Sequence, residues 1–323
     1  MNQSSNHAIR LENLSKSYRK NRREAVQAVQ DLSLTVPQGQ VMGFLGENGA
    51  GKTTTIKMMC GLMRPTAGRV SLNGIDVISH RSQAMSQVGA VLEGTRNVYW
   101  RLTAWQNLLY FGRLKGFSGR SLRQRAESLL RELELWERRN DEVKGFSRGM
   151  QQKVAIACAL ITDPPILLLD EPTLGLDVHA AFTVKQQVKA LARTYGKTIV
   201  LTTHQLDMAE ELCDRVVIIR KGKMIVDELK PKLLNLFQQE YFEFRFDMTA
   251  NEVEPHLPEL PLITATISGK EARTLLTGVL PDDVSIYQVL ALLEQKGMRL
   301  HSFERAQPSL EEVFMQLTQN QLQ

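Results

Sequence analysis

Eight consecutive residues have the types and spacing needed to hold a polyphosphate. They fit the pattern G-x-x-x-x-G-K-[ST] at every fixed position, and they are Gly46, Glu47, Asn48, Gly49, Ala50, Gly51, Lys52 and Thr53. Glycines let the backbone curl so that its N–H groups point at an anion, and a following helix adds free N–H groups and a partial positive charge. Lys52 would reach the outer phosphates, and the Thr53 hydroxyl would bind Mg²⁺. The alternative is a glycine turn between a strand and a helix that binds nothing.

Two carboxylates and a histidine follow apolar runs further along the chain. Asp170 and Glu171 come directly after Ile166–Leu169, which is typical of a buried parallel strand, and ligands of open α/β sheets bind at the carboxyl ends of such strands. We expect Asp170 to hold the Mg²⁺ shell and Glu171 to orient and deprotonate an attacking water. His204 closely follows a second run, Thr198–Thr202, where it would contact a γ-phosphate. The structural alternatives are a salt-bridged acid and a histidine that only packs.

Four further positions give weaker signals. Tyr18 closes an expected strand, where its ring could stack on a nucleobase, although packing is the commoner role of such a residue. Glu93 stands at the end of another apolar strand. Ser147 can cap a helix, and Gly149 would let the backbone approach a ligand closely. These last two residues predict a second helix N-terminus suited to an anion, with a simple capped helix as the alternative.

The elements expected around these residues make an α/β fold with a small antiparallel β layer and a helical insert. The phosphate-binding octet lies between a buried strand, Val41–Leu45, and a helix that includes Thr54. The antiparallel layer is expected from a strand over 9–18, two short strands within 25–36, and a strand over 70–72. Further apolar strands are expected over 88–92, 216–219 and 223–226. Helical spacing over 104–115, 122–135, 150–161 and 178–195 predicts the larger helices, with the insert at about residues 95–150.

A change in the sign of the charge indicates a domain boundary near residue 231. From Lys232 onward the sequence has 7 Lys+Arg and 13 Asp+Glu, whereas the whole chain carries a formal charge of +5. We therefore expect a first domain at 8–230 and a small α+β accessory domain at 231–323. The accessory domain is expected to contain strands over 241–247, 264–268, 272–277 and 299–303, and helices over 283–296 and 309–318.

The composition argues against several classes of protein. The cysteines, Cys60, Cys158 and Cys213, are widely spaced in apolar segments, which predicts reduced core thiols of a cytoplasmic protein and neither disulfides nor a metal centre. The N-terminus lacks the apolar core of a secretion signal, and the most apolar stretch, Val154–Leu169, is broken by an acid and two prolines. We therefore expect that the chain does not cross a bilayer by itself. No aromatic-interleaved basic stripe is present, so no nucleic-acid partner is expected.

In combination, these motifs resemble those of the ATP-binding cassette (ABC) family, the nucleotide-hydrolysing subunits of membrane transporters. The resemblance covers residues 8 to about 228, in the family's order: Tyr18, the phosphate loop 46–53, Glu93 in place of a glutamine, the signature 147–151, the strand and acids 166–171, the turn 174–177 and His204. The N-K-x-D pattern of GTPases is absent, which favours ATP. The stretches 92–103 and 147–150 are similar to the daunorubicin-resistance branch of exporter ATPases.

The resemblance implies a role for each matching residue. Tyr18 would stack on adenine, Lys52 would bind the β- and γ-phosphates, Thr53 and Asp170 would hold Mg²⁺, Glu171 would be the general base, and His204 would contact the γ-phosphate. Ser147 and Gly149 would touch the ATP held by a second copy, because two cassettes of the family face head to tail around two ATP molecules. Glu93 could still ligate Mg²⁺ but adds a negative charge, and Arg148 and Met150 replace a small residue and an amide.

The resulting expectation is an ATP-hydrolysing subunit of an exporter, cytoplasmic and held on the inner face of the cell membrane by separate permease subunits. Nucleotide would close two copies together, and the opening would be transmitted through the region Glu93–Leu108. One alternative is a soluble cassette ATPase acting on DNA or ribosomes, although the span from Lys52 to Ser147 is short for the coiled-coil insert of such proteins. Another is a nucleotide-gated regulatory binder with little hydrolysis, suggested by Glu93 and Met150.

Overall fold

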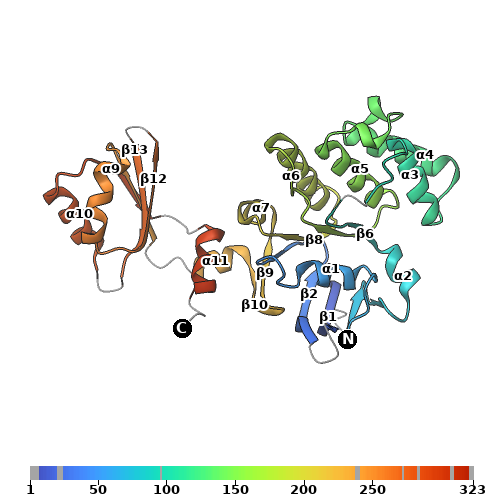
Figure 1. Cartoon of the computed structure of the whole chain (residues 1–323), viewed down its shortest axis with the longest axis horizontal. Helices are drawn as coiled ribbons and strands as arrows, with labels where there is room; N and C mark the ends of the chain where they lie inside the picture. The colour runs from blue at the N-terminus through green and yellow to red at the C-terminus, as the bar shows by residue number, and fades with distance from the viewer. Residues whose placement is uncertain are drawn as a thin grey trace. The chain divides into compact units, whose positions relative to one another are not determined.

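The computed structural model describes residues 7–19, 25–94, 97–236, 241–270, 273–281, 284–305 and 309–319. Its contacts divide the chain into two compact units, Met1–Lys230 and Pro231–Gln323, which are described separately below (Figure 1). Some residues of the stretches interpreted above, Thr95, Arg96, Ala272 and Asp283 among them, lie outside the described residues. Within the described ranges, no helix combines the length and the apolar character that a membrane span requires.

A six-stranded sheet forms the centre of the first unit. Its order is β10-β9-β3-β8-β7-β6, with bounds Lys223–Leu229, Arg215–Arg220, Val41–Leu45, Thr198–Thr203, Ile166–Asp170 and Val88–Val91. All neighbours are parallel except β10, which pairs antiparallel with β9. Every residue of β3, β7 and β8 is buried, as expected for parallel strands that are covered on both faces. The predicted α/β core is confirmed.

Helices cover both faces of this sheet. Figure 1 shows α1 (Lys52–Met59) on one side of β8 and β6, and α6 (Val178–Arg193) and α7 (Leu206–Leu212) on the other. The helix α5 (Arg148–Leu160) lies on the same side as α6. Because β3 and β7 lie on either side of β8, their carboxyl ends bring the phosphate loop and the two acids to the same edge.

The antiparallel layer is a four-stranded sheet with the order β2-β1-β4-β5. Its strands are β2 (Ala25–Pro37), β1 (His7–Arg19), β4 (Ala67–Leu72) and β5 (Ile75–Asp76). The expectation of two short strands within 25–36 is wrong, because β2 is continuous. Asn13 and Asp31 both adopt a φ of 48°, the register shifts around them, and Asn13 Nδ2 donates to Asp31 Oδ1 at 2.9 Å. The polar break therefore becomes a bulge inside a strand pair and does not form a turn.

The helical insert contains α3 (Ala104–Leu114) and α4 (Gly119–Glu132), followed by the 3-10 turns Trp136–Arg138 and Val143–Gly145. Thr103 and Gln106 form a capping box at the start of α3. A short helix that the sequence did not predict, α2 (Arg81–Ser86), precedes β6, and α7 is a second such helix. Both helices are shorter than two and a half turns, so they show little apolar periodicity in the sequence.

The second unit is a small α+β body around a four-stranded antiparallel sheet. The sheet order is β12-β13-β11-β14, with bounds Ile263–Lys270, Arg273–Val279, Tyr241–Phe246 and Leu300–Arg305. With α9 (Ala250–Val253) and α10 (Ile286–Gln295), the chain order is β-α-β-β-α-β, the ferredoxin-like arrangement. Phe244 and Phe246 point into its apolar core, which agrees with the period-two pattern of that strand. The helices α8 (Lys230–Leu236) and α11 (Leu310–Gln319) complete the chain, and Ser309 and Glu312 make the expected capping box.

Candidate nucleotide-binding and catalytic site

The phosphate loop forms one wall of a cavity of about 430 Å³. The residues that line this phosphate cavity are Ala28, Asn48, Gly49, Ala50, Gly51, Lys52, Thr53, Thr54, Glu93, Glu171, Leu174 and His204. Most of the predicted nucleotide-binding residues therefore surround one space. Glu47 contributes its carbonyl oxygen, which accepts from Ala50 N at 3.1 Å and so closes the curl of the loop.

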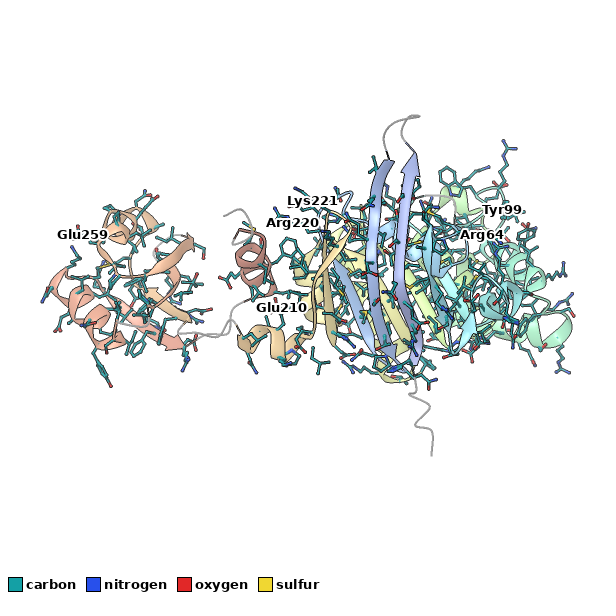
Figure 2. All side chains as sticks on the ribbon, turned by 90° about the horizontal axis from the view of Figure 1, so that it is seen from below. Arg64, Tyr99, Glu210, Arg220, Lys221 and Glu259 are labelled. Carbon is teal, nitrogen blue, oxygen red and sulfur yellow. The ribbon has the colours of Figure 1, made fainter. Side chains whose placement is uncertain are left out.

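Two glycines of the loop are required by close backbone packing. A Cβ at Gly46 would lie 2.2 Å from the carbonyl oxygen of Ile219, and a Cβ at Gly51 would lie 2.3 Å from that of Ala28. The turn after β9, which begins at Lys221 (labelled in Figure 2), also holds the loop, because Gly222 N donates to Ala50 O at 3.0 Å. The loop is thus preformed by its neighbours β2 and β9.

Lys52 is buried at the start of α1 and folds back over its own loop. Its Nζ donates to the carbonyl oxygens of Gly46 (2.6 Å) and Glu47 (3.2 Å), and it lies 3.9 Å from Glu171 Oε1. Burial lowers the pKa of the Lys52 amine, while the negative charges of Glu171, Asp170 and Glu93 act in the opposite direction. Lys52 is therefore a partly desolvated cation among three acids, and its positive charge offsets part of their repulsion of a polyanion.

Asp170 is arranged as an oxygen ligand for a hard cation. Its Oδ1 accepts from the hydroxyls of Thr53 (3.1 Å) and Thr202, while its Oδ2 is buried and has no hydrogen-bond partner among the described residues. Burying a carboxylate oxygen without a partner is unfavourable. The hydroxyl of Thr53 and the carboxylates of Asp170 and Glu93 are the oxygen ligands that Mg²⁺ prefers. The residues present therefore fit this ion.

Glu171 is held at the end of β7 by its neighbours. Its backbone adopts a φ of 49°, which is uncommon for a residue with a side chain. Glu171 N donates to both the carbonyl and the hydroxyl oxygen of Thr202, each at 3.1 Å. Its Oε1 lies 2.9 Å from His204 Nδ1. The structure thus brings Lys52, Asp170, Glu171 and His204 together, as the sequence predicted.

Glu93 lies between the phosphate cavity and a second cavity of about 450 Å³. The second cavity is lined on its other side by Trp100, Arg148 and Gln151, and Glu171 and Leu174 line both cavities. Glu93 is also one of the acids that act on the charge of Lys52. It therefore joins the phosphate site to the start of the helical insert.

Tyr18 lies beside the phosphate loop and does not line the phosphate cavity. Its hydroxyl is 3.4 Å from Thr54 Oγ1 and donates to Met63 Sδ at 3.0 Å, and Lys16 Nζ lies 5.6 Å from the ring centroid. The side chain is 39% exposed. A partly exposed ring next to the start of α1 is placed where a nucleobase attached to bound phosphates could stack.

Ser147 and Gly149 lie apart from this group, and neither is among the described residues that line the phosphate cavity. Ser147 caps α5 by accepting from Met150 N at 3.3 Å. Gly149 is buried, and a Cβ there would lie 2.5 Å from Cβ of Ala180. The interpretation of Gly149 as a residue that opens the backbone to a ligand is therefore incomplete, because a side chain of the same unit occupies the adjacent space.

Comparison with known proteins shows the family. A model of the ABC transporter family matches residues 29–174. The daunorubicin/doxorubicin resistance ATP-binding protein DrrA of Streptomyces peucetius is 34% identical over 98% of this chain and 94% of its own length. The chain belongs to the ABC transporter ATP-binding proteins. The resemblance to the daunorubicin-resistance branch is thereby confirmed.

Other relatives of this ABC protein carry different export or transport names. ABC transporter ATP-binding protein NatA of Bacillus subtilis is 41% identical over 63% of this chain and 82% of the relative. Nod factor export ATP-binding protein I of Sinorhizobium fredii is 40% identical over 68% of this chain and 62% of the relative. These names describe those proteins.

Solved cassettes have the same fold as this ABC protein. A dimeric cassette in a post-hydrolysis state, bound to ADP and Pi, is 30% identical, with a TM-score of 0.63 over 68% of this chain and 98% of that chain. An ATP-binding subunit of an ABC transporter is 32% identical, with a TM-score of 0.63 over 71% and 93%. The ABC protein is therefore an ATPase with a P-loop core.

Thr202 is the residue of the ABC site that sequence reasoning missed. Its hydroxyl binds Asp170, and its backbone and hydroxyl oxygens hold Glu171. The strand register pairs Asp170 with Thr202, so the link depends on β7 and β8 being neighbours. The signal in the sequence was a hydroxyl residue at the end of an apolar strand, two positions before His204. The role of Thr202 could be recognised only once the pairing of β7 with β8 was known.

Proposed function

We propose that this chain is the ATP-hydrolysing subunit of an exporter and that it acts on separate membrane-spanning permease subunits from the cytoplasmic face of the cell membrane. The printed names of its relatives in Streptomyces peucetius and Sinorhizobium fredii support export as the direction of transport. We further propose that residues 8–230 are the ATP-binding domain and that 231–323 are an accessory domain. The separate apolar core of the second unit supports that organisation.

The phosphates of ATP would occupy the phosphate cavity. Backbone N–H groups of the loop and of α1 would bind the anion, and Lys52 would exchange its two carbonyl acceptors for β- and γ-phosphate oxygens. Thr53, Asp170 and Glu93 would hold Mg²⁺, which when bound neutralises charge on the phosphates. The unpartnered Asp170 Oδ2 supports this assignment. Tyr18 would stack on adenine.

Glu171 would be the general base for the attacking water. Its position beside the phosphate cavity and 2.9 Å from His204 supports this role, since the imidazole can hold the carboxylate in place. His204 would also contact the γ-phosphate and report its loss. The proton taken from water would be held on the Glu171 carboxylate, whose Oε1 lies 3.9 Å from the buried Lys52 Nζ.

A second copy would complete the site. Ser147 and Gly149 lie outside the phosphate cavity of their own chain, so the capped end of α5 is free to meet an ATP held by another copy. The solved cassette that is dimeric and bound to ADP and Pi supports the association of two copies. Two copies would thus enclose two ATP molecules and separate after hydrolysis.

The permease contact would lie on the helical insert. Exposed apolar side chains gather around the second cavity and α3, and they include Tyr99, Trp100, Tyr110, Leu114 and Phe117 (Tyr99 is labelled in Figure 2). An exposed apolar group of this size supports a protein partner. Glu93 and Trp100 line the same cavity, so movement of the insert would be sensed at the phosphate site.

The observation that carries the proposal is that Lys52, Glu171 and His204, residues far apart in the sequence, line one cavity with the phosphate loop, while Asp170 accepts a hydrogen bond from Thr53 of that loop. We predict that Glu171→Gln retains ATP binding but lowers the turnover number by roughly 10²–10⁴-fold, because the amide cannot accept the water proton. Steady-state ATPase assays and equilibrium binding of a fluorescent ATP analogue measure the two effects.

The exposed Glu137 provides a matched control, since Glu137→Gln makes the same chemical change on the helical insert. The Glu171→Gln protein should also sediment as a dimer at saturating Mg-ATP. Turnover at the parent rate would remove Glu171 from the role of general base. A monomer under those conditions would contradict the two-ATP dimer.

A further inference from the structure

The N-terminal residues of α5 and α6 are in close contact with each other. Outside its own helix, Ala180 is the one described residue that would lie within 4 Å of a Cβ at Gly149, and its Cβ would be 2.5 Å away. Carbon atoms in contact are normally about 3.5–4.0 Å apart. Ala180 cannot easily retreat, because its backbone N–H donates to Asp177 Oδ1 at 2.8 Å in the N-cap of α6. Any side chain at position 149 must therefore push α5 and α6 apart.

A second contact connects the same two segments. Arg148 Nη1 donates to the carbonyl oxygen of Gly175 at 3.4 Å, and a Cβ at Gly175 would lie 2.5 Å from that nitrogen. The guanidinium therefore lies across the turn 174–177. This turn begins close to the catalytic acid, since Leu174 N donates to the carbonyl oxygen of Glu171 at 3.1 Å. The capped end of α5 is thus linked through this turn to Glu171 of the same chain.

We propose that Gly149 is glycine because Ala180 must pack against it, so that residues 147–149 and the turn 174–177 form one rigid body. This inference rests on the proposed two-ATP dimer for its consequence. When Ser147 contacts the ATP of the second copy, this rigid body would transmit the resulting change of position directly to Glu171 of its own chain. Arg148 and Ala180 are then positioning residues, since neither is among the described residues that line the phosphate cavity of their own chain.

The thermal stability of the full-length monomer tests the packing contact. Gly149→Ala should lower the Tm by about 3–8 °C through overpacking, although alanine favours a helix more than glycine does. Adding Ala180→Gly should restore the Tm, because it removes the methyl group that the new Cβ meets. Adding Ala181→Gly should not restore it, since Ala181 is not within 4 Å of that Cβ. An unchanged Tm for Gly149→Ala would overturn the contact.

The dimer dissociation constant at saturating Mg-ATP tests the consequence. In the Glu171→Gln background, Gly149→Ala should raise this constant by about tenfold or more, and Ala180→Gly should reverse the rise. Sedimentation velocity over a range of protein concentrations measures it. If Gly149 instead only makes room for nucleotide, the double substitution would stay as weak as the single one, and the proposal would be overturned.

A variant that leaves positions 147–150 untouched gives a second test. Ala180→Val enlarges the same contact from the α6 side and should also raise the dimer dissociation constant, whereas Ala181→Val should not. Equal dimerisation of these two variants would overturn the proposal. A Glu171→Gln parent that remains monomeric would overturn the two-ATP dimer and with it the link to Glu171, while the Tm of the Gly149 and Ala180 variants would still decide the packing contact.

Discussion

At the scale of single residues, the site is defined by how its negative charges are balanced. Asp170, Glu171 and Glu93 all act on the buried amine of Lys52, and His204 holds one of the Glu171 oxygens. Three acids beside a site for a polyanion repel it unless cations compensate. Lys52 supplies one positive charge, and Mg²⁺ would supply the rest. The charge of Glu93, where the family has a glutamine, would therefore make nucleotide binding depend more strongly on the metal.

The substitution Glu93→Gln tests this dependence. Removing one negative charge should strengthen binding of ATP without Mg²⁺ by about fivefold, because one carboxylate–phosphate repulsion of about 1 kcal/mol is lost. It should raise the Mg²⁺ concentration for half-maximal ATPase activity by a similar factor, because one oxygen ligand becomes neutral. Titration of a fluorescent ATP analogue in EDTA and a Mg²⁺ titration of turnover measure the two changes.

The Glu137→Gln protein again provides the control for the loss of one exposed carboxylate. If Glu93→Gln left both constants at the parent values, Glu93 would be neither a metal ligand nor a source of repulsion in this site.

At the scale of elements, one buried amide fixes the loop that enters the helical insert. Asn107, on α3, is fully buried, and its Oδ1 accepts from Tyr99 N at 2.7 Å. Its Nδ2 donates to the carbonyl oxygens of Tyr99 (3.0 Å) and Thr103 (2.9 Å). A single side chain thus satisfies several backbone groups of the loop that carries Trp100, which lines the cavity shared with Glu93.

The substitution Asn107→Ala should lower the free energy of unfolding of the insert by about 1–3 kcal/mol, because it leaves buried backbone groups unpaired. The three tryptophans of the chain, Trp100, Trp105 and Trp136, all lie in the insert, so urea denaturation followed by their fluorescence reports on this element. Circular dichroism follows the remaining structure.

An Asn140→Ala protein, changed at an exposed position of the same insert, should unfold at the parent urea concentration. Parent-like tryptophan fluorescence for Asn107→Ala throughout the titration would show that the amide does not hold the loop.

At the scale of the whole molecule, the cysteines Cys60, Cys158 and Cys213 are buried in the core of the first unit. Burial raises the pKa of the thiols of Cys60 and Cys213 to about 12, and it also raises the pKa of Cys158. The expectation of reduced core thiols agrees with this, since all three are free and buried. Cys213 packs so closely on β3 that a Cβ at Gly43 would lie 2.7 Å from its Sγ. Cys213 therefore reports on the packing against β3.

We predict a loss of stability at alkaline pH. The pKa of each thiol is higher in the folded state than in the unfolded state. Each thiol therefore contributes fully to the free energy of unfolding below about pH 9, and this contribution is lost as pH rises toward about 12. The free energy of unfolding should fall by up to about 1.4 kcal/mol per pH unit for each such thiol in this window. Urea denaturation at pH 8, 9 and 10 measures the slope.

Alkylation by iodoacetamide gives the companion measurement. Native Cys60 and Cys213 should react at pH 8 about 10³-fold more slowly than in urea, as thiolate fractions differ by that factor. A Ser118→Cys protein adds an exposed thiol as the control, and it should react at the normal rate. Rapid alkylation of the native core thiols would contradict their burial.

The sequence by itself determined the chemistry of the site and the order of the main elements. The phosphate loop, the strand that ends in Asp170 and Glu171, and the cap at Ser147 are encoded within windows of a few residues, where turn geometry, apolar runs and capping act locally. These patterns could therefore be recognised in the sequence without any knowledge of long-range contacts. The resemblance to ABC proteins added the functional role expected of each of these residues.

Only the tertiary structure decided which distant residues meet. The order β3-β8-β7 places Thr53 against Asp170 and makes Thr202 a partner of both acids, and neither pairing has a local signal. The same holds for the single bulged strand β2 and for the packing of Gly149 on Ala180. Such contacts are chosen by how sheets and helices pack as a whole, because each is stabilised by neighbours that lie far away along the chain.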